Sequence, residues 1–277
     1  MLRILISGLT LAVLAGTARA DVVVIGASRD NTLYESPTGA LSNGAGEHFF
    51  AGKTGEGKIR RGLIRFDVAG ALPPGSAITG VTFTLYMSKT QAGPQPVALR
   101  RVLKDWGEGA SNAAGDEGAG APASPGDATW LHTFYDQQFW TAPGGDFAPT
   151  PSATSMMDKV GHYTWSSAEM VADTQAWLDN PAANFGWALL GNESTFSTAK
   201  RFDSRENANP AYRPALEVKY VPEPAALWML LWIVALGRGR ASRHGAAVAT
   251  HEEPRASARA AVPHRRTLRK REGRLRT

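Results

Sequence analysis

The chain has 277 residues and no cysteine, which excludes disulfides, thiolate metal sites and thiol nucleophiles. Its net charge of +5 is unevenly distributed, because residues 238–277 hold 12 Lys or Arg and 3 Asp or Glu, a balance of +9 that leaves −4 for the first 237 residues. The basic character therefore belongs to the C-terminal end, and no nucleic-acid partner is predicted.

The first twenty residues have the layout of a secretory signal peptide. Arg3 is followed by a short apolar stretch, residues 4–14, and Ala18 and Ala20 form a small-x-small cleavage pattern before Asp21. The alternatives are a buried N-terminal strand or a membrane helix, and the stretch is short for such a helix. We predict that residues 1–20 direct export, so that a chain without disulfides is held together by burial and hydrogen bonds alone.

Residues 21–220 are predicted to form one all-β domain. Gly and Pro are frequent, 29 and 17 residues, and apolar residues alternate with polar ones in residues 63–68 and 81–87, the period of half-buried strands. Short strands are also expected at residues 22–25, 48–51, 97–103, 163–165, 185–190 and 216–220. This number and spacing of strands predicts a single antiparallel β-sandwich of jelly-roll type.

Two segments depart from the strand pattern. Ser166 and Glu169 have the spacing of a helix capping box, and apolar residues share one face from Met170 to Leu178 before Pro181, which predicts a short helix. Residues 107–126 contain six Gly and six Ala in twenty residues. We expect this segment to be a long mobile loop that does not pack.

Several short motifs together resemble the DNRLRE-type domain, which is grouped with carbohydrate-binding module family 96. They are DNTLY at residues 30–34, SNGAG at 42–46, RRGLIRFD at 60–67, FDSRE at 202–206 and RPALEV at 213–218. The resemblance runs in order across most of residues 30–220. It implies an extracellular β-sandwich, in a family where some members bind acidic polysaccharides such as alginate.

No catalytic motif is complete. Residues 46–54 approach a P-loop but have five residues between the glycines where four are needed, and no Gly-x-Ser-x-Gly elbow occurs. His48, His132 and His162 show no metal-ligand spacing. Carboxylates such as Asp136 and Asp146 are unmarked by any motif, so a polysaccharide lyase or glycosidase remains a second alternative.

No cofactor is predicted, and calcium is left open. Oxygen ligands suitable for calcium gather around the glycine-rich segment, although none spells a calcium-loop pattern. These residues are Asp105, Glu108, Asp116, Glu117 and Asp127. A solvated loop is the preferred interpretation.

Two groups of side chains are candidate glycan contacts. Aromatic rings suit the C–H faces of sugars, and Trp130, Tyr135 and Trp140 lie in one loop-rich third of the domain, where they could alternatively plug the core. Cations suit uronate carboxylates or sulfates. The candidates are Arg60, Arg61, Lys200 and Arg201, whereas Arg65 and Arg205 are expected to pair internally with Asp67, Asp203 or Glu206.

The C-terminal end resembles a PEP-CTERM sorting signal. Pro222-Glu223-Pro224 precedes twelve apolar residues, 225–236, and then Arg238 and Arg240. The resemblance implies that residues 221–240 hold the chain in the inner membrane until a membrane-embedded exosortase processes it. Twelve residues make only about 18 Å of helix against a hydrocarbon core of about 30 Å, and 37 further residues follow Arg240, two departures from the pattern.

The final segment, residues 241–277, has no apolar periodicity and is read as a basic disordered tail. The less favoured interpretation is that this tail binds nucleic acid or anionic lipid. The sequence as a whole therefore predicts an exported, non-catalytic protein of the cell envelope or extracellular matrix that binds extracellular polysaccharide. The alternative is a purely structural matrix protein with no specific ligand.

Overall fold

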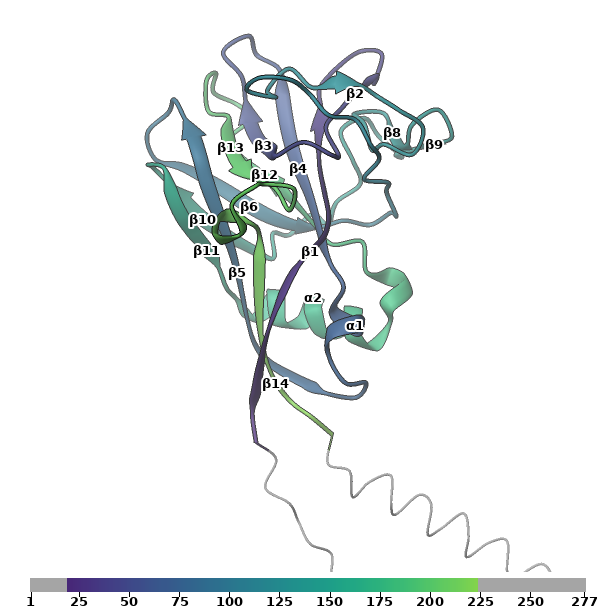
Figure 1. Cartoon of the computed structure of the whole chain (residues 1–277), viewed down its shortest axis with the longest axis vertical. Helices are drawn as coiled ribbons and strands as arrows, with labels where there is room; N and C mark the ends of the chain where they lie inside the picture. Colours follow the sequence, from purple (N-terminus) through teal and green to yellow (C-terminus); the bar gives the residue numbers. More distant parts are fainter. Residues whose placement is uncertain (1–18, 224–277) are drawn as a thin grey trace, which may run out of the picture. The chain divides into compact units, whose positions relative to one another are not determined.

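The computed structural model describes residues 19–223, which form an all-β domain with antiparallel strands (Figure 1). The strands and helices are, in order, β1 (Asp21–Tyr34), β2 (Leu41–Ser42), β3 (His48–Lys53), β4 (Ile59–Phe66), α1 (Val68–Ala71), β5 (Ala77–Thr90), β6 (Gln95–Arg101), β7 (Ala121–Pro122), β8 (His132–Phe134), β9 (Gln138–Phe139), β10 (Ala153–Met157), β11 (Gly161–Trp165), α2 (Ala168–Asp179), η1 (Pro181–Ala183), β12 (Trp187–Leu190), β13 (Lys200–Asp203), η2 (Pro210–Tyr212) and β14 (Ala215–Val221).

Most strands belong to two sheets that face each other. In the first sheet β5 pairs with β14, β13 and β11, and β14 pairs with the first half of β1. In the second sheet β12 lies between β4 and β6, β10 borders β6, and the second half of β1 borders β4. β1 and β3 take part in both sheets, so β1, β14, β5, β13, β3 and β4 form a closed ring of six hydrogen-bonded strands, a small barrel.

The space between the two sheets is filled by the main core. Phe83 of β5 stacks on Trp165, with ring centroids 5.3 Å apart, and meets Phe66 of β4 edge-on at 5.4 Å. The alternation predicted for residues 81–87 is confirmed, since Val81, Phe83, Leu85 and Met87 are all buried here. Burying each large side chain of this kind contributes about 1.5–3 kcal/mol to folding.

The predicted helix is confirmed as α2, with one difference at its start. The N-cap is Ser167, whose hydroxyl accepts a hydrogen bond from the backbone N–H of Met170, and not Ser166. Ser166 instead donates its hydroxyl to the carbonyl of Val81. The buried side of α2 carries Trp177, which packs against Trp187 between the sheets.

A second apolar cluster covers the outer face of the second sheet. Leu33 of β1 and Leu63 of β4 contact Trp106, Trp130 and Trp140, which come from the long connection between β6 and β10. The second sheet is therefore buried on both faces, which explains why Leu63 and Ile64 are both buried although they point in opposite directions.

The expectation that residues 107–126 do not pack was wrong. Ser111, Ala113 and Glu117 are buried, and β7 within this segment pairs with β2. The segment is held by polar contacts to β1–β4, such as those that Tyr34 and Arg60 donate to its carbonyls, which is why its Gly and Ala content was misleading. We refer to residues 107–126 as the glycine-rich loop.

The predicted signal peptide and the predicted sorting signal lie largely outside the described residues. Ala20 is exposed directly before β1, and Pro222 and Glu223 follow β14. Ala18, Pro224, Arg238, Arg240, the apolar residues 225–236 and the tail 241–277 lie outside residues 19–223. Within residues 19–223, no helix has the length and apolar character needed to cross a membrane.

Candidate functional site

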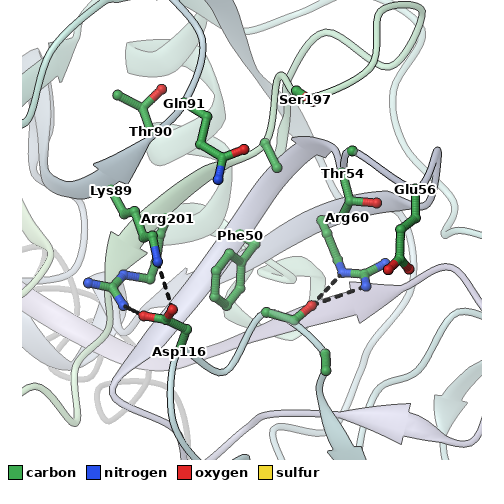
Figure 2. A pocket seen from close by; sticks show the side chains of 14 residues that line it. Phe50, Thr54, Glu56, Arg60, Lys89, Thr90, Gln91, Asp116, Ser197 and Arg201 are labelled. Atoms are coloured by element: carbon green, nitrogen blue, oxygen red, sulfur yellow. Dashed lines mark hydrogen bonds and ion pairs between the residues drawn. The ribbon is translucent and has the colours of Figure 1, made fainter.

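A groove of about 600 Å³ lies where β3, β4, β5 and β13 meet the glycine-rich loop (Figure 2). Its charged lining comes from four segments of the sequence, since Glu56 and Arg60 belong to one hairpin and the other three residues are far from it and from one another. These residues are Glu56, Arg60, Lys89, Asp116 and Arg201, and Phe50 adds an aromatic ring.

One end of the groove holds two cations that share a single carboxylate. Lys89 and Arg201 are opposite each other in the β5–β13 pairing. Lys89 Nζ lies 2.7 Å from Asp116 Oδ2, and Arg201 Nη1 lies 3.1 Å from Asp116 Oδ1. The Asp116 side chain is 71% exposed, so this carboxylate sits at the mouth of the groove. The hydrogen bond from Lys89 lowers the pKa of Asp116, which is therefore an anion.

Arg60 lies at the other end. Its Nε and Nη2 both donate to the carbonyl of Gly118 at 3.1 Å, Nη1 donates to the carbonyl of Ile59, and the guanidinium stacks on Tyr34 at 4.8 Å. Burial lowers the pKa of Arg60, which is 7% exposed. Among residues 19–223, no carboxylate forms an ion pair with this guanidinium.

Phe50 separates the two cationic ends. Figure 2 shows its ring between the Lys89–Asp116–Arg201 group and Arg60. The groove therefore combines an apolar patch with positive charge on both sides. This is a combination that suits a sugar ring bearing an acidic group.

Glu117 anchors the wall that carries Asp116 and Gly118. It accepts hydrogen bonds from Asn43 Nδ2 at 2.7 Å and from the backbone N–H groups of His48 and Glu47 at 2.9 and 3.2 Å. Burial raises the pKa of Glu117, but hydrogen bonds from His48 and Asn43 outweigh it, and the net direction is downward. Glu117 adopts φ of 61°, which turns the backbone so that Asp116 and Gly118 both reach the groove.

The seven predicted glycan contacts are only partly brought together. Arg60 and Arg201 both line the groove. Arg61 points the other way, where it binds Glu193 through two 2.8 Å contacts, donates to the carbonyl of Gly144 and lies 5.0 Å from the Trp130 ring. Tyr135 is half-buried and meets His132 edge-on.

Lys200, Trp130 and Trp140 belong to the interior, which corrects the expectation that they face a ligand. Lys200 is fully buried and donates to Thr90 Oγ1 at 2.7 Å and to two carbonyls of the β5–β6 turn. Burial lowers the pKa of Lys200. Trp130 and Trp140 are 9% and 5% exposed within the second apolar cluster, and Trp140 Nε1 donates to the carbonyl of Thr129.

The five acidic residues suggested for calcium do not form one site, because they have separate partners. Asp105 pairs with Arg29 and Arg65, Asp116 with Lys89 and Arg201, and Glu117 with His48. Asp127 accepts from the hydroxyl of Ser111, and Glu108 binds Arg205 through both oxygens.

Three other carboxylates do lie close together. Carboxylate oxygens of Asp30, Glu108 and Glu206 lie within 4.8 Å of one another, and Arg205 contacts Glu108 and Glu206. The predicted internal pairing of Arg205 with Glu206 is confirmed. Burial raises the pKa of Asp30 well above its ordinary value and raises that of Glu206.

The side chains considered for a hydrolase are engaged locally. His132 Nδ1 lies 3.0 Å from Thr129 Oγ1, while Asp146 accepts from the backbone N–H of Thr141 and pairs with Lys104 at 3.1 Å. Asp136 is exposed in a turn with φ of 59°. His132 and Asp146 are thus engaged by local neighbours.

Sequence reasoning missed Phe50, Lys89 and the role of Asp116. Lys89 lies near the end of β5, where it pairs with Arg201, but the pairing of β5 with β13 has no local signal in the sequence. No protein-family model matches this chain, and no curated protein is significantly similar to it. A functional assignment therefore depends on the groove itself.

Proposed function

We propose that the protein is exported and binds an acidic polysaccharide in the groove, without catalysing a reaction on it. The observation that carries this proposal is the pair Lys89 and Arg201 sharing one exposed carboxylate. Asp116 occupies the place that a uronate carboxylate of the glycan would take. Binding then exchanges one carboxylate for another, with little new cost of desolvating the cations.

The rest of the groove supports the same ligand class. Arg60 uses three of its five N–H donors on carbonyls, so two remain for a second acidic or hydroxyl group. Phe50 lines the groove between them and adds a small apolar area for the C–H groups of a pyranose, since its side chain is 7% exposed. Individually weak contacts of this kind become useful when many copies are displayed on one surface.

The export and sorting parts of the proposal rest on sequence. We propose that residues 1–20 are removed on export, that residues 221–240 are sorted as in PEP-CTERM proteins, and that an exosortase-type enzyme processes them at the inner membrane. The antiparallel sandwich is proposed to be a jelly roll of the DNRLRE type. The mature protein would then reside in the cell envelope or the exopolysaccharide matrix.

The test is affinity electrophoresis of the full chain through gels containing alginate or a neutral glucan, with and without calcium. We expect alginate to retard the wild type, and Lys89→Ala with Arg201→Ala to abolish the retardation. Asp116→Asn should increase it, because the internal competitor loses its charge. Two variants on β14, Lys219→Ala and Glu217→Gln, are controls for the loss of one positive and of one negative charge at exposed positions.

One observation favours the structural alternative. Three of the seven predicted glycan contacts are engaged within the protein: Arg61 pairs with Glu193, and Trp130 and Trp140 are buried. If no polysaccharide retards the folded chain, the protein is a structural matrix component. Shortening of the polymer would instead identify a lyase or glycosidase.

A further inference from the structure

Three aromatic side chains gather on the outer face of the first sheet, and we call them the aromatic cluster: Tyr86, His162 and Tyr212. The Tyr86 and Tyr212 rings are stacked, with centroids 4.0 Å apart and an interplanar angle of 12°. His162 meets Tyr86 edge-on at 4.9 Å. His162 is exposed and both tyrosines are half-buried, so the cluster borders solvent.

The strand pattern explains why these rings point outward. Phe83, Leu85 and Met87 of β5 are buried between the sheets, so Tyr86 and Ser88 face the opposite way. His162 of β11 lies directly beside Tyr86 in the β5–β11 pairing. Tyr212 arrives from η2, whose start is capped by the Asn209 side chain.

The cluster is continuous with the groove along β5. Ser88 accepts a hydrogen bond of 3.1 Å from Arg201 Nε, which places Arg201 over the same outer face. Tyr86 precedes Ser88 by two residues, roughly 7 Å along the strand. A cationic position and an aromatic position thus lie two residues apart on one face of β5.

We propose that the aromatic cluster is a second sugar subsite, which binds one pyranose ring of an acidic glycan whose carboxylate lies at Lys89 and Arg201. This inference rests on the proposed function and extends it. The positive groove selects an anionic chain, and the ring face of Tyr212 provides an apolar platform for the neighbouring sugar. The outer edge of His162 supplies N–H or lone-pair contacts to hydroxyl groups.

The competing explanation is that the stacked tyrosines only hold η2 against the sheet. In that case their removal lowers stability without changing which glycans bind. The two explanations differ in how affinity depends on the length of the ligand. A second subsite is engaged only by a chain long enough to leave the groove.

The experiment measures the affinity of the full chain for oligouronates of increasing length, prepared from alginate. For the wild type we expect affinity to rise with length until both positions are occupied. Tyr212→Ala should bind the shortest oligomers normally and lose roughly three- to tenfold for the longer ones. His162→Ala, at an exposed position, should lose part of the same gain and provides a second variant if Tyr212→Ala misfolds.

Two controls separate the ring from other effects. Tyr212→Phe keeps the platform and should behave as the wild type, and Phe139→Ala removes an exposed ring elsewhere, 62% exposed in β9. If Tyr212→Ala and His162→Ala match the wild type at every length while Lys89→Ala with Arg201→Ala abolishes binding, this inference is wrong and the proposed function stands. If the wild type binds no oligouronate, the proposed function itself fails, and this inference fails with it.

Discussion

Glu117→Ala tests whether the glycine-rich loop is anchored by polar contacts. The Glu117 carboxylate accepts from the Asn43 amide and from the backbone N–H groups of Glu47 and His48. It also lies 3.2 Å from His48 Nδ1. Removing the carboxylate leaves the two backbone N–H groups without this acceptor, and Asn43 Nδ2 keeps only its hydrogen bond to the carbonyl of His48.

The expected size of the effect follows from these contacts. A buried donor without a partner costs about 1–3 kcal/mol, and three donors lose their acceptor. Water reaches part of the site, since Glu47 is exposed and His48 is only partly buried, so we take the lower half of the range. We expect Glu117→Ala to lower the free energy of unfolding by roughly 3–6 kcal/mol. Glu117→Gln keeps one oxygen acceptor and should be intermediate.

The assay is urea denaturation of the full chain, followed by tryptophan fluorescence, because all six tryptophans of residues 19–223 are buried. Elastase cleavage within residues 107–126 reports loop opening separately, since this segment is rich in Ala. Asp116→Ala is the matched control, as the neighbouring carboxylate makes only exposed ion pairs. If Glu117→Ala behaves like Asp116→Ala in both assays, the loop is not anchored as described.

Three further predictions concern other parts of the chain. Burial raises the pKa values of Asp30 and Glu206, so the folded chain binds more protons than the unfolded chain. The free energy of unfolding should therefore fall as the pH rises above about 4. Urea midpoints measured across this pH range should fall less in Asp30→Asn than in the wild type. Lys200→Met should cost about 2–4 kcal/mol in urea unfolding, because a hydroxyl and two carbonyls lose their donor; an unchanged midpoint would contradict this. Arg61→Ala should lower the melting temperature and leave alginate retardation unchanged, whereas lost retardation in a folded variant would return Arg61 to the binding site.

The strands were predictable where one face of a strand meets the core and the other meets solvent. Residues 81–87 alternate for this reason, and their inward side chains proved to be Val81, Phe83, Leu85 and Met87. The second sheet gave a weaker signal because it is buried on both faces. The packing of Trp130 and Trp140 over its outer face depends on the long β6–β10 connection, which has no periodic pattern.

The glycine-rich loop shows a different limit. Gly and Ala content indicates whether a segment can bury apolar side chains, and by that measure residues 107–126 cannot pack. The segment is ordered instead by Glu117 and by Asp127, which accepts hydrogen bonds from Ser111 and Ser124. Such contacts depend on backbone N–H groups of strands elsewhere in the chain, so composition alone does not reveal them.

Adjacent residues of a strand point to opposite faces, so only one cation of each predicted pair can face the groove. The sequence indicates which one only for the pair Lys200 and Arg201. Phe202 marks the buried face of β13, so Lys200 shares that face and Arg201 is on the other. The phase of β13 could therefore have selected Arg201 over Lys200. For the pair Arg60 and Arg61 the pattern does not decide, because within β4 Ile64 on the face of Arg60 and Leu63 on the face of Arg61 are both buried. Only the pairing of β4 with its neighbours decides that Arg60 faces the groove and Arg61 faces Trp130. An arginine in a strand covered on both sides is thus assigned to a site by topology, and its sequence neighbours carry no information on the choice.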